Sequence, residues 1–229
     1  MYVAAGATHV GRVRTSNQDA FVVYGDAGLW AVADGMGGYR DGDIAARMVC
    51  DALSKLDASL PFEVAIDAVR QALSDVNLQL HRASIRPVNP VMSGSTVAML
   101  LARRTSAALI WAGDSRVYRL RHGMLAQLTT DHTWAAELNL PPSNDEADHA
   151  ITRAVGGEDF LLLDVRRERV RPGDRYLVCS DGLTRELTDA QISSILATGD
   201  AARCVDALLA AVLATAARDN VTAVIVDAE

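Results

Sequence analysis

Hydrophobic residues recur along this chain with two different spacings, and four segments show the spacing of a helix. Apolar positions separated by three and four residues run through Asp43–Leu56, Phe62–Ile85, Asp189–Thr198 and Asp200–Ala217. This spacing places the apolar side chains on one face of a helix, so each segment is predicted to pack against a core. Thr188 or Asp189 is expected to cap the start of the third helix.

Other segments are short, rich in β-branched or apolar residues and bounded by Gly and Asp, which predicts strands. They are Ala20–Tyr24, Leu29–Ala33, Ser95–Ala102, Ala107–Ala112, Val117–Arg121, Leu125–Thr129, Leu161–Arg169, Arg175–Cys179 and Val221–Asp227. Strands, two helices, more strands, two helices and a last strand follow one another, unlike the regular alternation of a parallel α/β fold. This order predicts an α+β fold in which antiparallel sheets pack together and the helices are segregated.

Composition narrows the class of protein. The chain has 229 residues and no linker, repeat or low-complexity tract, so residues 1–229 are expected to form a single domain. Half of the residues are hydrophobic, which excludes a disordered chain, and the net charge of −7 argues against a nucleic-acid binder. No stretch approaches the roughly 20 apolar residues of a membrane span, and the N-terminus does not resemble a secretory signal.

The cysteines indicate a reducing compartment. Cys50, Cys179 and Cys204 are odd in number, widely spaced and set in apolar surroundings, without a CxxC pair. We therefore expect reduced core residues in a cytoplasmic protein, and no disulfide or cysteine metal site.

Acidic residues stand beside several predicted strands. They are Asp19, Asp34, Asp114, Asp181 and Asp219. Each one alone is typical of an ordinary turn, but strands that share one core could bring these ends together at one rim. Clustered carboxylates repel one another unless they are protonated or bind cations, and oxygen ligands favour Mg²⁺ or Mn²⁺. None of the five histidines has the spacing of a zinc ligand.

Seven motifs, taken in order, resemble those of the metal-dependent protein phosphatases (PPM, the type 2C class), most closely its compact bacterial members. They are Gly11–Ala20, Val32–Gly38, Gly94–Thr96, Trp111–Tyr118, Leu128–Thr133, Cys179–Thr184 and Asp219–Thr222. The resemblance implies a four-layer α-β-β-α sandwich, with two antiparallel sheets flanked by helix pairs. It also implies a serine/threonine phosphoprotein phosphatase, which hydrolyses phosphate monoesters by attack of a water bridged between two Mg²⁺ or Mn²⁺ ions, without a phosphoenzyme.

The same resemblance implies a set of metal ligands. Asp34 would bridge the two ions, and the carbonyl group of Gly35 would add a further ligand. Asp19 would bind one ion, and Asp181 and Asp219 would bind the other. Asp114, together with Asp181, matches the position that helps to bind a weaker third ion.

The resemblance assigns two further roles and shows three departures. Arg14 would act beside Asp34 in catalysis by binding the substrate phosphate through its guanidinium fork, and Asn220 would support the site. Gln18 stands where many relatives have Glu, and Met36 stands where animal relatives have a His proposed as the general acid. The segment 133–150, where the family carries a flap, is short and acidic.

Two nearby residues are open to a structural or a catalytic reading. His132 is more simply a hydrogen-bonded structural residue than an acid–base group, and Asp131 is ambiguous.

Two alternative functions remain. One is a catalytically weak, phosphoprotein-binding regulator of the same fold, which the complete set of acidic residues argues against. The other is a phosphatase for a single phosphorylated anti-sigma antagonist, from which Arg14 and Gly113–Arg116 point away. We expect the partners to be phosphorylated Ser/Thr proteins, a Ser/Thr kinase and its targets among them, with no nucleic acid or membrane, and the protein to be a monomer.

Overall fold

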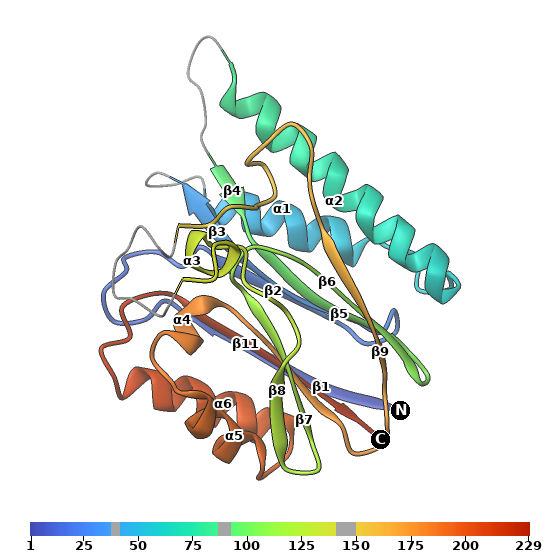
Figure 1. Ribbon diagram of the computed structural model, residues 1–229, viewed down its shortest axis with the longest axis vertical. Coiled ribbons are helices and arrows are strands. Elements are labelled where there is room, and N and C mark those ends of the chain that lie inside the picture. The colour runs from blue at the N-terminus through green and yellow to red at the C-terminus, as the bar shows by residue number, and fades with distance from the viewer. Residues whose placement is uncertain (38–41, 87–92, 141–149) are drawn as a thin grey trace.

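Two antiparallel sheets are stacked face to face in this computed structural model, and helices cover the outer face of each sheet (Figure 1). The structure describes residues 1–37, 42–86, 93–140 and 150–229. The predicted α+β fold, a four-layer sandwich of two antiparallel sheets flanked by helices, is confirmed. The last residue of the Val32–Gly38 motif and large parts of the loop-like stretches Arg86–Pro90 and Asn139–Glu146 lie outside the described residues.

Each sheet joins segments that are far apart in the sequence. The first has the order β1 (Tyr2–His9), β11 (Val221–Ala228), β10 (Arg175–Cys179), β7 (Arg116–Arg121) and β8 (Met124–Gln127). The second has the order β2 (Asp19–Tyr24), β3 (Leu29–Gly37), β5 (Val97–Arg103), β6 (Ser106–Ala112) and β9 (Asp164–Arg169), and β4 (Ser93–Ser95) pairs with the end of β3.

Strand residues alternate between two buried environments, which explains why the central strands are apolar throughout. In β3, Trp30 and Val32 pack between the sheets, whereas Ala31 and Ala33 face the helices. Such alternation follows from the two-residue period of a strand. Each fully buried large side chain contributes about 1.5–3 kcal/mol to folding, so both layers of contacts hold the sandwich together.

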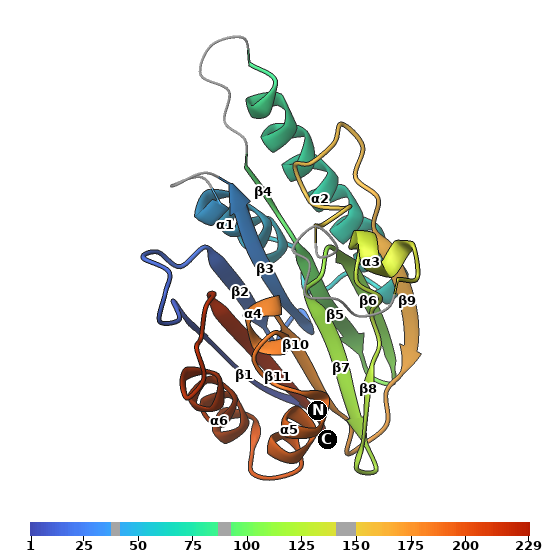
Figure 2. The same cartoon turned by 60° about the vertical axis from the view of Figure 1, so that its left-hand side comes forward.

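The helices form two outer layers, as the views in Figures 1 and 2 show. The second sheet is covered by α1 (Gly42–Ser54) and α2 (Phe62–Ser84), and the first by α5 (Asp189–Leu196) and α6 (Ala201–Leu213). Thr188 caps α5 in a capping box with Gln191, which settles the position of that N-cap. Two short helices, α3 (Trp134–Glu137) and α4 (Asp181–Thr184), were not predicted.

The sequence-based prediction also missed β1, which pairs with β11 along its whole length, from Tyr2 opposite Ala228 to His9 opposite Val221. Its sequence is rich in small residues and shows no alternating pattern, so its strand conformation comes from pairing with β11 rather than from local preference. The predicted strand Ser95–Ala102 is divided at Thr96, and β3 continues beyond Ala33 to Gly37. Asp34 therefore lies within a strand rather than after one.

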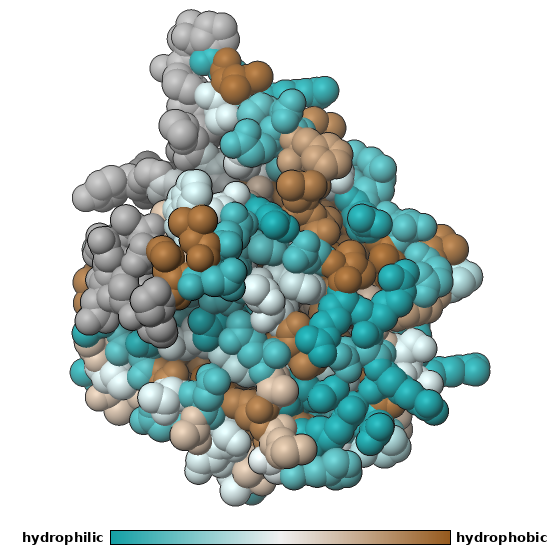
Figure 3. Space-filling view, in the orientation of Figure 1, coloured by the Kyte–Doolittle hydropathy of each residue, from teal (hydrophilic) through white to brown (hydrophobic). Residues whose placement is uncertain are grey.

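Three features bear on the predicted class of protein. Cys50, Cys179 and Cys204 are buried and free, as expected, and burial raises the pKa of Cys50 and Cys179 to about 12. Within the described ranges, no helix has the length and apolar character needed to cross a membrane. The face shown in Figure 3 is mainly hydrophilic. The exposed apolar residues of the described part of the chain include Trp134 in α3 and Leu138 just after it.

Candidate metal centre

An acidic cavity of about 260 Å³ opens at the rim where strands of both sheets end, and its lining includes Asp34, Asp181 and Asp219. The pairing of β2 with β3 places Asp19 directly opposite Asp34. Asp181 follows β10 at the start of α4, and Asp219 lies just before β11. These carboxylates therefore meet at one rim, as predicted, although Asp34 lies inside β3 rather than at its end.

Burial and mutual repulsion shape the charge of the cluster. Burial and the nearby carboxylate of Asp19 raise the pKa of Asp34 well above its usual value, and three further carboxylates act in the same direction. Burial also raises the pKa of Asp19 to about 6, although hydrogen bonds from Thr222 and Ser180 oppose the rise. For Asp114, burial and the neighbouring Asp181 raise the pKa to about 7. Without a cation, the cluster therefore retains protons that isolated aspartates would lose.

Three buried carboxylate oxygens of this cluster have no hydrogen-bond partner among the described residues: Oδ1 of Asp19, Oδ1 of Asp114 and Oδ1 of Asp181. A buried acceptor without a partner costs roughly 1–3 kcal/mol, and more if it is charged. A divalent cation would satisfy such oxygens, and a set of carboxylates matches the preference of Mg²⁺ and Mn²⁺. The residues present therefore fit the metal that the sequence predicted, although their individual roles stay predictions.

Two of the carboxylates pair with arginines. Both oxygens of Asp219 accept hydrogen bonds from Arg14, at 2.8 Å from Nε and 2.7 Å from Nη2. Arg185 Nη2 lies 2.7 Å from Oδ2 of Asp181. Within the described ranges, no three His, Cys, Asp or Glu side chains are already gathered around one point. The predicted phosphate ligand Arg14 thus lies at the cavity, but it contacts a carboxylate there.

Asn220 ties the N-terminal loop to the site. Its Nδ2 donates hydrogen bonds to the carbonyl oxygens of Val10 and Ser16, at 2.9 and 3.0 Å. Its Oδ1 accepts from the backbone N–H of Gln18 at 2.8 Å. These three bonds bracket Arg14 and fix the loop that carries it, which supports the predicted supporting role of Asn220.

Asp19 is oriented by two hydroxyl groups that the sequence analysis did not assign. Its Oδ2 accepts hydrogen bonds from Ser180 Oγ at 2.8 Å and from Thr222 Oγ1 at 2.6 Å. Both bonds use the same oxygen, so Oδ1 remains available to a cation. The only sequence signal was that both residues fall within the motifs around Asp181 and Asp219.

The backbone around Asp34 is held from both sides. Its N–H donates to Thr96 Oγ1 at 3.1 Å, and its carbonyl oxygen accepts from Ser95 Oγ at 3.1 Å. A Cβ atom on Gly35 would overlap the carbonyl oxygen of Gly42, so this position accepts only glycine without a shift of the backbone. Gly35 lines the cavity, and the role of its carbonyl group as a ligand stays a prediction.

Two other polar residues make structural contacts. His132 Nδ1 accepts from the backbone N–H of Gly113 at 3.1 Å, and its ring stacks on Trp111. Asp131 pairs with Arg116 at 2.7 Å. Neither residue lines the acidic cavity, which favours the structural interpretation of His132.

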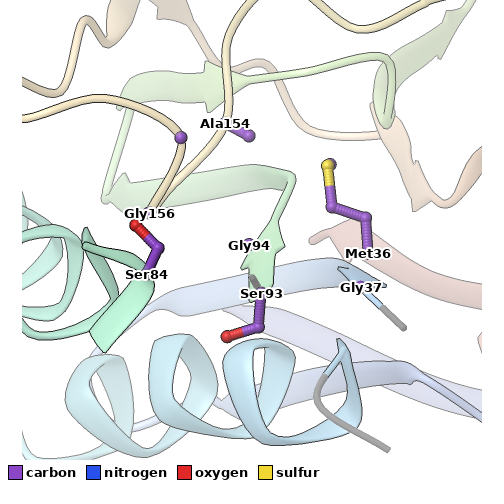
Figure 4. Close-up of a pocket in the computed structure, with 8 residues that line it drawn as sticks. Met36, Gly37, Ser84, Ser93, Gly94, Ala154 and Gly156 are labelled. Atoms are coloured by element: carbon purple, nitrogen blue, oxygen red, sulfur yellow. The ribbon is translucent and has the colours of Figure 1, made fainter. Parts of the chain in front are cut away.

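A second cavity of about 320 Å³ adjoins the acidic one, and the two share Met36 and Gly37 (Figure 4). Its other lining residues are small, including Ser84, Ser93 and Gly94. Met36 points into it with its thioether, and this side chain has no transferable proton. Ile151, which directly follows the flap segment 133–150, lines the acidic cavity, while residues 141–149 lie outside the described part of the chain.

The raised pKa values predict how stability depends on pH when the protein is free of metal. Between the ordinary value of 3.8 and the raised values of about 6 for Asp19 and about 7 for Asp114, the folded state binds more protons than the unfolded state. Stability should therefore fall as pH rises through this window, by a few kcal/mol in all. We expect the melting temperature in EDTA to be lower at pH 8 than at pH 5, and Mn²⁺ to restore it at pH 8. A melting temperature in EDTA that rises from pH 5 to pH 8 would contradict this.

Comparison with known proteins gives consistent results. A family model described as Protein phosphatase 2C matches residues 5–224. The chain is 34% identical over 230 residues to the serine/threonine protein phosphatase PstP of Mycobacterium tuberculosis. This alignment covers 95% of this chain and 43% of the relative. The chain thus spans less than half the length of that relative. The chain is also 31% identical over 205 residues to the serine/threonine phosphatase stp of Listeria welshimeri. That alignment covers 82% of this chain and 81% of the relative.

Solved structures give the same picture. PppA, described as a key regulatory component of T6SS in Pseudomonas aeruginosa, superposes with a TM-score of 0.93 and 39% identity over 100% of this chain and 98% of that one. The catalytic domain of PstP in complex with two manganese ions superposes with a TM-score of 0.88 and 31% identity, over 99% and 97% of the two chains.

Proposed function

Because this chain belongs to the protein phosphatase 2C family, we propose that it is a serine/threonine phosphoprotein phosphatase that acts at the acidic cavity. The observation that carries the proposal is the set of unpartnered, buried carboxylate oxygens beside Asp34. Such oxygens are costly unless a cation binds them, and Arg14 lies at the same cavity to contact an anionic substrate. A phosphate monoester hydrolase of the two-metal type needs both features.

We assign the metal ligands as the sequence resemblance implied. Two Mn²⁺ or Mg²⁺ ions would be held by Asp34, the Gly35 carbonyl group, Asp19, Asp181 and Asp219, with Asp114 at a weaker third position. Two manganese ions are described for the PstP catalytic domain, which supports this assignment. The ions would supply an activated water nucleophile and neutralise the charge that develops on the phosphate.

The side chains of this protein do the remaining work. Arg14 is 56% exposed and its partner Asp219 is 24% exposed, so their ion pair contributes only about 0–1 kcal/mol. Exchange of that carboxylate for two oxygens of a phosphate dianion therefore costs little, and the planar fork of the guanidinium orients the ester. Asn220 keeps the Arg14 loop in place during the exchange. Since Met36 has no proton to give, the departing serine or threonine oxygen takes its proton from water.

The proposed substrates are proteins phosphorylated on serine or threonine, acted on in the cytoplasm in opposition to a Ser/Thr kinase. The cavity beside Met36 supports a peptide rather than a small phosphate ester, because it offers a weakly polar space next to the acidic cavity. A side chain adjacent to the phosphorylated residue could occupy that space.

The test is phosphate release from a phosphothreonine peptide and from p-nitrophenyl phosphate, with Mn²⁺, with Mg²⁺ and with EDTA. We expect phosphate release with Mn²⁺ or with Mg²⁺ but not with EDTA. The kcat/KM should be higher for the peptide than for p-nitrophenyl phosphate. Folded protein that binds Mn²⁺ but releases no phosphate from either substrate would contradict the proposal. Binding of the phosphopeptide under those conditions would favour the phosphoprotein-binding regulator instead.

A further inference from the structure

Arg185 reaches two carboxylates at the outer side of the acidic cluster. It caps the C-terminal end of α4, four residues after Asp181, and this spacing brings its side chain back over that residue. Its Nη2 lies 2.7 Å from Asp181 Oδ2 and 3.8 Å from Asp114 Oδ2. One guanidinium group therefore contacts one carboxylate and closely approaches the other.

The two carboxylates would otherwise form a site for an ion. Asp114 is 7% exposed and Asp181 is 12% exposed at the side chain, and each has a buried Oδ1 without a hydrogen-bond partner. The positive charge of Arg185 lies within ion-pair distance of both carboxylates. Arg185 thus stabilises the ionised carboxylates electrostatically, as a bound cation would.

We propose that the Arg185 guanidinium is a built-in cation for the Asp114–Asp181 pair, and that a divalent ion can bind there only by displacing it. This inference rests on the proposed metal-dependent function, because it concerns the weaker third position of that site. Arg185 is 49% exposed, so its side chain has solvent to move into. The protein would accordingly bind two ions readily and a third only weakly.

Electrostatics sets the size of the effect. An arginine that remains near the pair repels an incoming divalent ion, and its displacement breaks a close ion pair with Asp181. Removal of the guanidinium should therefore strengthen binding of the third ion roughly 10- to 100-fold, which is the range of ordinary site-to-site coupling.

The test is a count of Mn²⁺ ions on metal-free protein, from the electron paramagnetic resonance signal of the free ion during a titration. We expect two tight sites in the wild type and a third tight site in Arg185→Gln. The affinity of Arg185→Lys for the third ion should lie between those of the other two proteins. Arg153→Gln is the matched control, because it removes the same charge from a partly buried arginine near the cavity. Arg153 pairs with Glu137 and Asp164, outside the acidic cluster. Adding Asp114→Asn to Arg185→Gln should abolish the gained site.

Three outcomes would overturn the inference: equal binding by the wild type and Arg185→Gln, an equal gain in Arg153→Gln, or a gained site that survives Asp114→Asn. None of these outcomes touches the proposed phosphatase function. Conversely, a wild type without any tight site, beside an Arg185→Gln variant that gains one at Asp114, would support the inference and contradict the two-ion site.

Discussion

Replacement of Asp34 by asparagine should lower phosphate release by about a thousandfold or more and weaken Mn²⁺ binding, while the protein stays folded. Asp34 is the residue whose pKa is raised by all four of the other clustered carboxylates, so its charge lies at the centre of the group. Asparagine has nearly the same shape but cannot bridge two cations as a charged ligand. The measurements are phosphate release from a phosphothreonine peptide and a Mn²⁺ titration.

Stability separates this effect from misfolding. Removing one charge from a crowded acidic cluster relieves repulsion, so metal-free Asp34→Asn should melt at or above the temperature of the metal-free wild type at pH 8. Added Mn²⁺ should then stabilise the variant less than the wild type. Asp67→Asn, on the exposed face of α2, is the control and should behave as the wild type does. Retention of more than a tenth of the activity by Asp34→Asn would contradict the assignment of Asp34.

The second large effect is expected for Gly182→Ala. A Cβ atom at Gly182 would overlap the backbone carbonyl oxygen of Asn220, and it would lie 3.5 Å from Cβ of Asp219. Backbone atoms cannot swing aside as the end of a side chain can, so α4 and the start of β11 must separate. We expect a loss of about 3 kcal/mol, which lowers the melting temperature by about 6–12 °C in a chain of this size.

The same shift should weaken Mn²⁺ binding, because it moves Asp181 and Asp219 apart. Thermal unfolding in EDTA and a Mn²⁺ titration measure the two effects separately. Gly25→Ala is the matched control, since a Cβ atom at Gly25 meets nothing within 4 Å, and it should change the melting temperature little. If both alanine variants melt within 2 °C of the wild type, the close approach of α4 to β11 does not constrain the site.

Much of the fold could be predicted because its layers impose their pattern on the chain. Strands such as β6 are buried on both faces and read as apolar runs, and α2 presents an apolar face with a helical period. The strand β1 carried no such signal: its Ala- and Gly-rich sequence is held by its partner β11. Helix and strand ends shifted by a few residues, as with β9, which begins at Asp164 rather than Leu161.

The site, like the fold, has features that the sequence predicts and features that it does not. The acidic residues could be predicted because each lies within a motif and, except for Asp34 inside β3, beside a strand end. The register of β2 and β3 then brings Asp19 and Asp34 together. Local pattern could not predict which side chains hold them. Thr222 reaches Asp19 across the interface between the two sheets, a contact between residues 203 positions apart. In the sequence, Arg185 and Asp181 have the spacing of an ordinary helical ion pair. Only the structure shows that Arg185 also lies close to Asp114.

The pairing of β1 with β11 has a consequence for how the protein folds during its synthesis. Asp19 and Asp34 are synthesised well before Asp219, and the Asn220 bonds to the Arg14 loop exist only after β11 has been made and has paired with β1. Such distant pairings make folding slow, since most of the chain must be in place before they form. A nascent chain without β11 therefore presents an incomplete set of the proposed ligands, and the proposed metal centre can form only after β11 has paired with β1.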